Sequence, residues 1–125
     1  MLSSTDRIVL NPLKGALVAT LQGSLTTDVL QAFQADLLHR LSHDQIHHLI
    51  LDFSGMEMMD PDEFADVRKI AEMGKLMGVE PIAVGLRPEV VYALVQLGVE
   101  TLGLRAALNV EDAFDRLQKT NKNAG

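Results

Sequence analysis

The topology of this chain is set by residues 49–64, which run LILDFSGMEMMDPDEF. The apolar run at 49–51, which is followed by Asp52, predicts a buried strand. Ser54-Gly55 then indicates a turn at the surface. In an α/β domain, the turn after a parallel strand lies at the carboxyl edge of the sheet, where binding sites usually form. We therefore predict that the functional surface lies at this turn.

The second half of the same stretch carries the signals of a helix start. Asp60 is a favourable N-cap, because its carboxylate can accept hydrogen bonds from the free amides of the first turn. Pro61 suits the first helical position, where its missing N–H costs nothing. Asp62 and Glu63 place negative charge at the positive end of the helix dipole. The sequence therefore predicts a strand, a turn and a capped helix in succession.

Hydrophobic periodicity predicts the elements on either side of this stretch. Thr26 or Thr27 is expected to cap the first helix, Gly98 to stop the third and Asn109 to cap the last. The predicted strands lie at 7–10, 16–21, 46–53 and 81–86, with at most a short edge strand within 101–107, and the predicted helices lie at 24–42, 60–78, 90–97 and after 109.

These elements follow one another in the order β-β-α-β-α-β-α-(β)-α. Asn11-Pro12 is expected to turn the first strand into the second, which gives an N-terminal antiparallel hairpin. Strands separated by helices imply parallel crossovers. We therefore predict the α/β class: a single domain, residues 1–120, with a mixed, mostly parallel sheet and about four helices. The polar residues 121–125 are expected to form a frayed C-terminal tail.

Composition excludes several classes of protein. The 125 residues are 47% hydrophobic and contain no cysteine, which excludes a disulfide framework and thiolate chemistry. A formal net charge of −6 and an aromatic content of 4% argue against binding to nucleic acid. No apolar run reaches the roughly 18 residues that a membrane span needs. The N-terminus lacks a signal-peptide pattern, so we expect no membrane insertion and a cytoplasmic location.

The histidines form a pattern that could hold a metal ion. His39, His43 and His47 recur at intervals of four residues, and His48 follows directly. On one continuous helix the first three would share a face. The chain is expected to leave the helix near Ser42, however, and no cysteine accompanies the histidines. We therefore predict a solvated helix end and no metal site.

Enzyme chemistry finds little support in the sequence. Asp52 follows an apolar strand, as does the acceptor aspartate of phosphoryl-receiver domains, but the acidic pair and the lysine that such domains need are missing. There is neither a Gly-rich phosphate loop nor a nucleophile elbow. We predict instead that Asp52 sets the shape of the loop at Ser54 by hydrogen bonding. The protein is expected to be non-enzymatic and to use no cofactor.

Two runs of the sequence resemble a known family. The run LILDFSGMEMMD at 49–60 resembles the signature of STAS domains, the family of anti-sigma factor antagonists. The run VGLRPEVVYALVQLGV at 84–99 is similar to the stressosome subgroup, the RsbS and RsbR scaffold proteins, and LRAALNVEDA at 104–113 extends the likeness. The resemblance covers about residues 8–117. It implies an α/β fold with a mixed sheet and a function in protein binding.

The resemblance also implies a switch that this chain lacks. Family members use the turn and the first helical residues after the central strand to bind a small ATP-dependent switch kinase, which phosphorylates a Ser or Thr there. Here the residue directly after Asp60 is Pro61, which has no hydroxyl. Asp62 and Glu63 follow, and either they partly imitate the phosphorylated state of a non-switchable scaffold, or they only stabilise the helix by about 0.3–1 kcal/mol each. We favour the second interpretation, and the acceptor is lost under both.

The resemblance therefore predicts a regulatory protein-binding module. Its partners would be a switch-type serine/threonine kinase and other STAS scaffold proteins, within a homo- or hetero-oligomer. The alternative is an accessory subunit of a lipid-trafficking ABC transporter, because stand-alone STAS proteins also occur there. The predicted partner-facing residues are those of the helix start and of the next strand-to-helix junction, which shares the carboxyl edge: Asp60, Pro61, Asp62, Glu63, Arg87 and Glu89.

Some of these residues also have a purely structural interpretation. Arg87 and Glu89 flank Pro88 and fit a helix-start device equally well. The methionines are expected to fill the core, although Met56 and Met58 lie beside the predicted turn and could form an adaptable contact patch.

Overall fold

A computed structural model of the protein describes residues 8–96 and 104–124, with side chains up to residue 118. Strands and helices alternate in the order predicted from the sequence. The strands are β1 (Val9–Leu13), β2 (Ala16–Gln22), β3 (His48–Gly55), β4 (Glu80–Val84) and β5 (Arg105–Ala107), and the helices are α1 (Thr27–His43), α2 (Pro61–Leu76), α3 (Pro88–Gln96) and α4 (Val110–Ala124).

The strands form one sheet in the order β1-β2-β3-β4-β5. β1 runs antiparallel to β2, and every other neighbouring pair is parallel. β3 therefore lies at the centre, as its continuous apolar sequence indicates. The predicted fold class, a mixed and mostly parallel sheet with an N-terminal hairpin, is confirmed.

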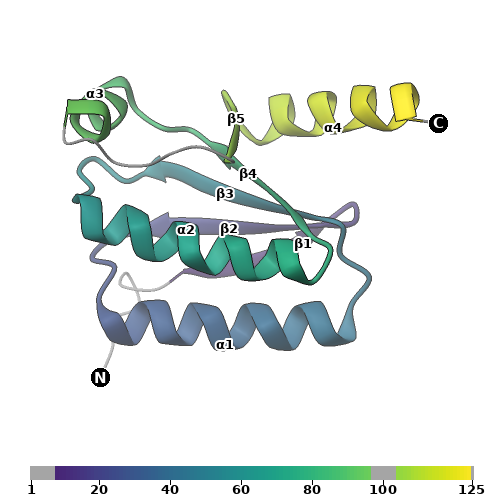
Figure 1. The fold of residues 1–125 in the computed structure, drawn as a ribbon, viewed down its shortest axis with the longest axis horizontal. Coiled ribbons are helices and arrows are strands. Elements are labelled where there is room, and N and C mark those ends of the chain that lie inside the picture. Colours follow the sequence, from purple (N-terminus) through teal and green to yellow (C-terminus); the bar gives the residue numbers. More distant parts are fainter. Residues whose placement is uncertain (1–7, 97–103, 125) are drawn as a thin grey trace.

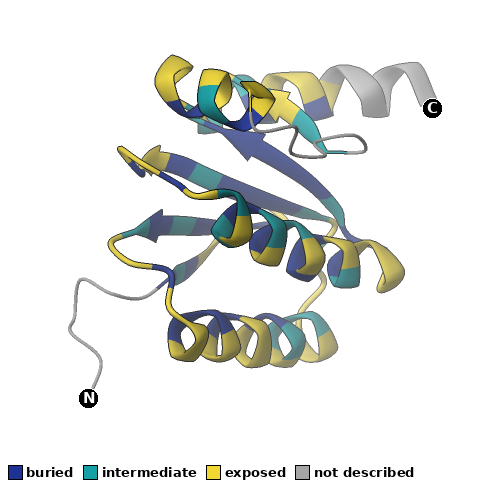
Figure 2. Cartoon of the chain, turned by 60° about the vertical axis from the view of Figure 1, so that its left-hand side comes forward, coloured by how far each residue is buried: buried dark blue, intermediate teal, exposed yellow. Residues whose placement is uncertain are grey.

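Helices cover the two faces of the sheet unequally. α1, α2 and α3 pack on one face, while α4 lies on the other (Figure 1). Because side chains alternate along a strand, Leu49 and Leu51 of β3 join the large core with Phe33, whereas Ile50 joins the small core under α4 with Ala113. Figure 2 shows the resulting pattern, in which buried residues line the sheet and the inner sides of α1 and α2.

The predicted turn at Asn11-Pro12 is wrong. Both residues lie within β1, and the chain reverses at Lys14 and Gly15, whose φ angles are 50° and 82°. Positive φ at both central residues gives the turn that joins two twisted strands directly. Pro12 is tolerated because β1 is an edge strand, where a missing N–H can face away from its neighbour.

Helix caps follow local sequence closely. The hydroxyl of Thr26 accepts from the amide of Val29 at 3.2 Å, and the side-chain oxygen of Asn109 accepts from the amide of Asp112 at 2.8 Å. The expected stop at Gly98 and the residues expected to precede β5 lie outside the described residues. α4 runs to Ala124 and so includes most of the stretch expected as a tail. Within the described ranges, no helix combines the length and the apolar character that crossing a membrane requires.

Candidate functional site

The carboxyl end of β3 continues into a loop whose backbone is held by local hydrogen bonds. A carboxylate oxygen of Asp52 accepts from the amide of Ser54 at 3.0 Å. The carbonyl of Phe53 accepts from the amide of Met56 at 2.9 Å. The second contact closes a turn over Ser54 and Gly55, but these residues are also the last two of β3, so the strand runs further than predicted. Asp52 accepts the hydrogen bond from Ser54, as predicted.

The residue after β4 packs directly against the end of β3. Gly85 has a φ of 71°, and a Cβ atom there would lie 2.9 Å from the Cβ of Ser54 and 3.1 Å from a carboxylate oxygen of Asp52. The guanidinium of Arg87 donates to the carbonyl of Ser54 at 3.3 Å. The amide of Gly85 donates to the carbonyl of Leu108 at 3.1 Å, which ties in the chain after β5. Three segments far apart in the sequence therefore share one fixed edge.

The start of α2 uses two of its carboxylates to hold its own backbone. Asp60 accepts from the amide of Glu63 at 2.8 Å, and Glu63 accepts from the amide of Asp60 at 3.1 Å, which is a complete capping box. The second carboxylate oxygen of Glu63 accepts from the amide of Leu25, before α1, at 3.2 Å. Pro61 occupies the first helical position and is partly buried.

Asp62 differs from its two acidic neighbours. It is exposed and makes no hydrogen bond or ion pair with any residue that the structure describes. Its charge lies in the first turn of α2, at the positive end of the helix dipole. Of the acidic residues predicted to face a partner at the start of α2, Asp62 is therefore the one whose carboxylate makes no hydrogen bond within the part of the chain that the structure describes.

The loop between Gly55 and Asp60 presents one apolar side chain to solvent. Met56 and Met59 are buried, at 3% and 7% exposure, whereas Met58 between them is 84% exposed. Beside it lies a hollow of about 230 Å³, lined by Glu57, Met58, Met59, Glu89, Val90 and Ala93. We call this the Met58 hollow.

Sequence reasoning placed Arg87 and Glu89 at this edge but did not single out Glu57, Val90 or Ala93. Arg87 contacts Ser54 directly, and Glu89 lines the Met58 hollow opposite the loop. No local pattern marks Glu57, because its neighbours in the sequence show only an exposed loop residue. Its place beside the hollow depends on the packing of α3 next to the loop. The hollow arises only where two segments about 30 residues apart meet.

The histidines do not converge on one point. α1 extends to His43, whose ring lies 4.3 Å from that of His39 between centroids, and the Nδ1 atom of His43 lies 2.8 Å from the carbonyl of His39. His47 lies in the connection to β3 and His48 begins that strand. Among the described residues, no group of three or more His, Cys, Asp or Glu side chains is placed to hold a metal ion.

The surroundings of His48 change its pKa. Burial lowers the pKa of His48 below its ordinary 6.5, and the nearby His47 and Arg105 lower it further, while Glu80 opposes them. The Nδ1 atom of His48 is buried and has no hydrogen-bond partner among the residues that the structure describes. The folded protein therefore favours the neutral form of this imidazole.

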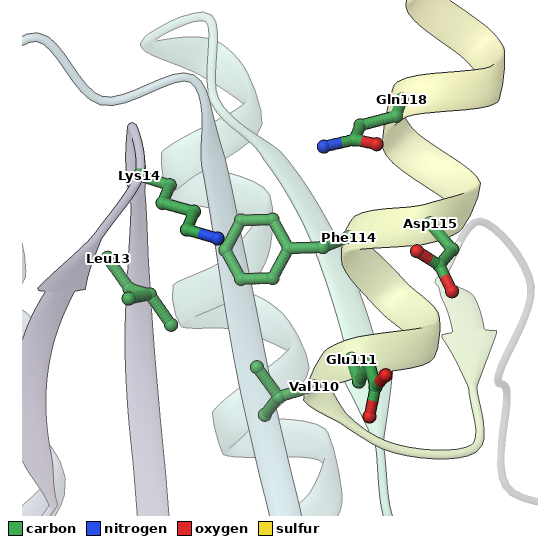
Figure 3. Close-up of a pocket in the computed structure, with 7 residues that line it drawn as sticks. All are labelled: Leu13, Lys14, Val110, Glu111, Phe114, Asp115 and Gln118. Carbon is green, nitrogen blue, oxygen red and sulfur yellow. The ribbon is translucent and has the colours of Figure 1, made fainter.

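A larger hollow lies on the other face of the sheet, between the β1–β2 turn and α4. It measures about 410 Å³ and is lined by Leu13, Lys14, Val110, Glu111, Phe114, Asp115 and Gln118. In Figure 3 the ammonium group of Lys14 points toward the ring of Phe114. None of these residues belongs to the predicted partner face, and the two hollows lie on different elements.

A family model for the STAS domain matches residues 7–113. The chain belongs to the STAS domain family. The match covers the whole sheet, the carboxyl edge and the start of α4, so the family suggested by the motifs is confirmed.

Two curated Bacillus subtilis proteins are similar to this STAS domain. They are the RsbT co-antagonist proteins RsbRD and RsbRB, which are 30% and 31% identical over 67 and 68 residues. Each match covers 54% of this chain and 24% of the relative. The STAS domain therefore matches about a quarter of the length of these relatives.

Solved structures share the fold at lower identity. An RsbS variant of Moorella thermoacetica aligns with a TM-score of 0.78 and 22% identity, over 93% of this chain and 98% of that one. A chain of the stressosome, described as a signal integration and transduction hub, aligns at 0.79 and 22% over 90% and 98%. The anti-sigma factor antagonist SpoIIAA in its unphosphorylated form aligns at 0.69 and 18% over 90% and 96%. These likenesses establish the common fold.

Proposed function

We propose that this STAS domain is a non-enzymatic, cytoplasmic regulatory module that binds other proteins through its carboxyl edge, in the manner of a stressosome scaffold or anti-sigma factor antagonist. The observation that carries the proposal is the held end of β3, where Ser54 hydrogen-bonds the carboxylate of Asp52 and the guanidinium of Arg87 just before the loop that leads to α2. A surface that does not reorganise on binding loses little entropy when a partner docks. The two relatives are RsbT co-antagonists, so an RsbT-like protein is the first partner to test.

Asp62 offers the sharpest test of this edge, because replacing it leaves the capping box intact. We expect Asp62→Lys to weaken binding of an RsbT-like protein from the same organism at least tenfold in isothermal titration calorimetry. Glu111→Lys is the matched control, since both residues are exposed second residues of a helix and Glu111 lies on α4. Equal affinity of Asp62→Lys and wild type would contradict a partner face at the start of α2.

The second part of the proposal is that the usual hydroxyl switch is lost at Pro61. Incubation with a switch-type serine/threonine kinase, Mg²⁺ and ATP should leave residues 60–63 without phosphate in peptide mass spectrometry. The Pro61→Ser variant restores a hydroxyl at the helix N-terminus, where a phosphate is electrostatically favoured. It should therefore accept phosphate under the same conditions. Stoichiometric phosphate on Ser54 or Thr101 of the wild type would mean that the switch has moved elsewhere in the chain.

The transport alternative predicts a different assembly. A scaffold role predicts that mixing with an RsbR- or RsbS-type homologue gives a very large particle in gel filtration. An accessory subunit of a lipid-trafficking ABC transporter would instead copurify with an ATPase and form no such particle. The similarity to RsbRD and RsbRB favours the scaffold role.

A further inference from the structure

Met58 is an apolar side chain held in solvent by a loop that is fixed on both sides. Before it, Met56 is buried and its amide donates to the carbonyl of Phe53. After it, Met59 is buried and Asp60 is locked in the capping box. Met58 itself is 84% exposed. A single exposed apolar side chain is common on protein surfaces, so Met58 indicates a contact surface only together with an apolar opening beside it.

The Met58 hollow adds a receiving site next to this exposed side chain. Met59, Val90 and Ala93 supply apolar surface, and Val90 and Met59 are themselves buried in the core. At about 230 Å³ the hollow is smaller than the roughly 300–1,000 Å³ typical of small-molecule sites. Its size therefore suits a single side chain of another protein better than a free ligand.

The charge around the hollow is negative. Glu57 and Glu89 both line it, both are exposed, and neither makes a hydrogen bond or ion pair with a described residue. Arg87, two residues before Glu89, is turned to the carbonyl of Ser54. Two carboxylates at an apolar opening repel nucleic acid, anionic lipid and phosphorylated segments, and they attract basic ones.

We propose that Met58 and the Met58 hollow form the anchor for a partner protein whose docking segment carries an apolar side chain flanked by arginine or lysine. The apolar side chain enters the hollow against Val90 and Ala93, and the basic groups meet Glu57 and Glu89. Met58 packs on the outside of the same segment, where its flexible thioether adapts to the partner. The proposal rests on the proposed function, since it names the recognition chemistry of the edge proposed to bind proteins.

The first experiment uses methyl NMR of the full chain labelled with ¹³C at its methionine methyl groups. The probe is a helical peptide that presents one leucine between two arginines, compared with the same peptide carrying glutamates in place of arginines. We expect saturable shifts of the Met58 and Met59 methyl signals with the arginine peptide and none with the glutamate peptide. Identical shifts with both peptides, or shifts that avoid Met58 and Met59, would overturn the proposal.

Matched variants then test the charge of the rim. The double variant Glu57→Gln with Glu89→Gln should lower the affinity for the arginine peptide at least tenfold. Glu111→Gln with Asp115→Asn removes the same charge from α4 and should leave the affinity unchanged. If the two double variants lower the affinity for the peptide equally, the attraction comes from the net negative charge of the whole chain, and the hollow is not the anchor.

A second experiment with an RsbT-like protein separates this proposal from the general function. Met58→Ser removes the apolar contact from a side chain that is mostly in solvent, so the melting temperature should not change and the complex should weaken at least tenfold. Loss of binding in Asp62→Lys alone would keep the edge as the partner face and overturn the anchor. Loss of binding in Met58→Ser alone would support the anchor and contradict a partner face at the start of α2. Binding unaffected by either would reject both.

Discussion

Three acidic side chains open α2, and two of them accept hydrogen bonds from backbone amides while the third does not. The carboxylates of Asp60 and Glu63 accept from backbone amides, and Glu63 reaches Leu25 as well. Asp62 makes no such contact with the described residues. Of the two residues weighed as helix stabilisers, Glu63 therefore holds the helix start by hydrogen bonds, whereas Asp62 can act there only through its charge in the first turn.

The division predicts unequal losses of stability. Asp60→Ala should lower the free energy of unfolding by about 1 kcal/mol, the typical cost of losing an N-cap. Glu63→Ala should cost about 1–2 kcal/mol, because the partly buried amide of Leu25 and the exposed amide of Asp60 both lose their acceptor. Asp62→Ala should stay within about 0.5 kcal/mol of the wild type. Urea denaturation at neutral pH measures all three, and an Asp62→Ala loss as large as that of Asp60→Ala would contradict the hydrogen-bond assignment.

His48 predicts a pH dependence of stability. The folded pKa of His48 lies below its ordinary 6.5, mainly because of burial. Below pH 6.5 the unfolded chain therefore binds a proton at this residue that the folded chain does not, until the pH falls through the lowered folded pKa. Acidification from pH 7 toward pH 5 should reduce the free energy of unfolding through this residue.

The His48→Gln variant isolates the effect, because the other histidines and the carboxylates remain. Its free energy of unfolding should fall less than that of the wild type over the same pH range in urea denaturation. His39→Gln, on the exposed part of α1, serves as the control and should follow the wild-type profile. Parallel profiles for wild type and His48→Gln would show that burial does not disfavour the charged form.

At the scale of elements, the carboxyl edge depends on how closely the residue after β4 approaches the end of β3. Gly85 allows this approach, since it combines a positive φ with the absence of a side chain where Ser54 lies. Gly78, at the end of α2, has a similar φ of 83°, but an added Cβ would meet nothing within 4 Å. The two glycines therefore separate the cost of backbone conformation from the cost of a steric clash.

Gly78→Ala should cost about 1–2 kcal/mol, the penalty of placing a Cβ in the left-handed region. Gly85→Ala should cost about 1–3 kcal/mol more, because the backbone of Ser54 must also move. Chemical denaturation gives both values. Gly85→Ala should in addition shift the amide NMR signals of residues 52–60, whereas Gly78→Ala should leave them in place. Equal costs would mean that the loop yields freely and is not a fixed platform.

Across the whole molecule, the two faces of the sheet contribute unequally to stability. The face under α1, α2 and α3 holds the large core with Phe33 and Phe64, while the face under α4 holds a small one in which Phe114 is only partly buried. Because hydrophobic stabilisation scales with the apolar area removed from water, the first face should dominate.

Phe33→Ala should therefore cost about 3–5 kcal/mol, as for a fully buried phenylalanine. Phe114→Ala should cost about 1–2 kcal/mol, since part of its ring already contacts water. Thermal and urea denaturation with unchanged m-values would measure the difference within one cooperative transition. If Phe114→Ala were as destabilising as Phe33→Ala, α4 would be a principal part of the core.

The existence and order of the elements were predictable, because hydrophobic period and capping chemistry act over a few residues. Asp60, Thr26 and Asn109 each cap a helix through a neighbour three residues away, so their sequence context is sufficient. The prediction of a turn at Asn11-Pro12 was wrong because proline is also compatible with an edge strand. Only the pairing of the strands shows that β1 lies at the edge of the sheet.

The sequence by itself determined the fold class, the capped start of α2 and the absence of a hydroxyl at Pro61, since each is written in residues that are close along the chain. Only the tertiary structure decided that Glu63 accepts a hydrogen bond from the amide of Leu25 and that Arg87 donates one to the carbonyl of Ser54. It also decided that Glu57 and Glu89 line the same hollow. Those contacts join residues more than 30 positions apart. The packing of separate elements brings such residues together, and no local pattern of residues encodes it.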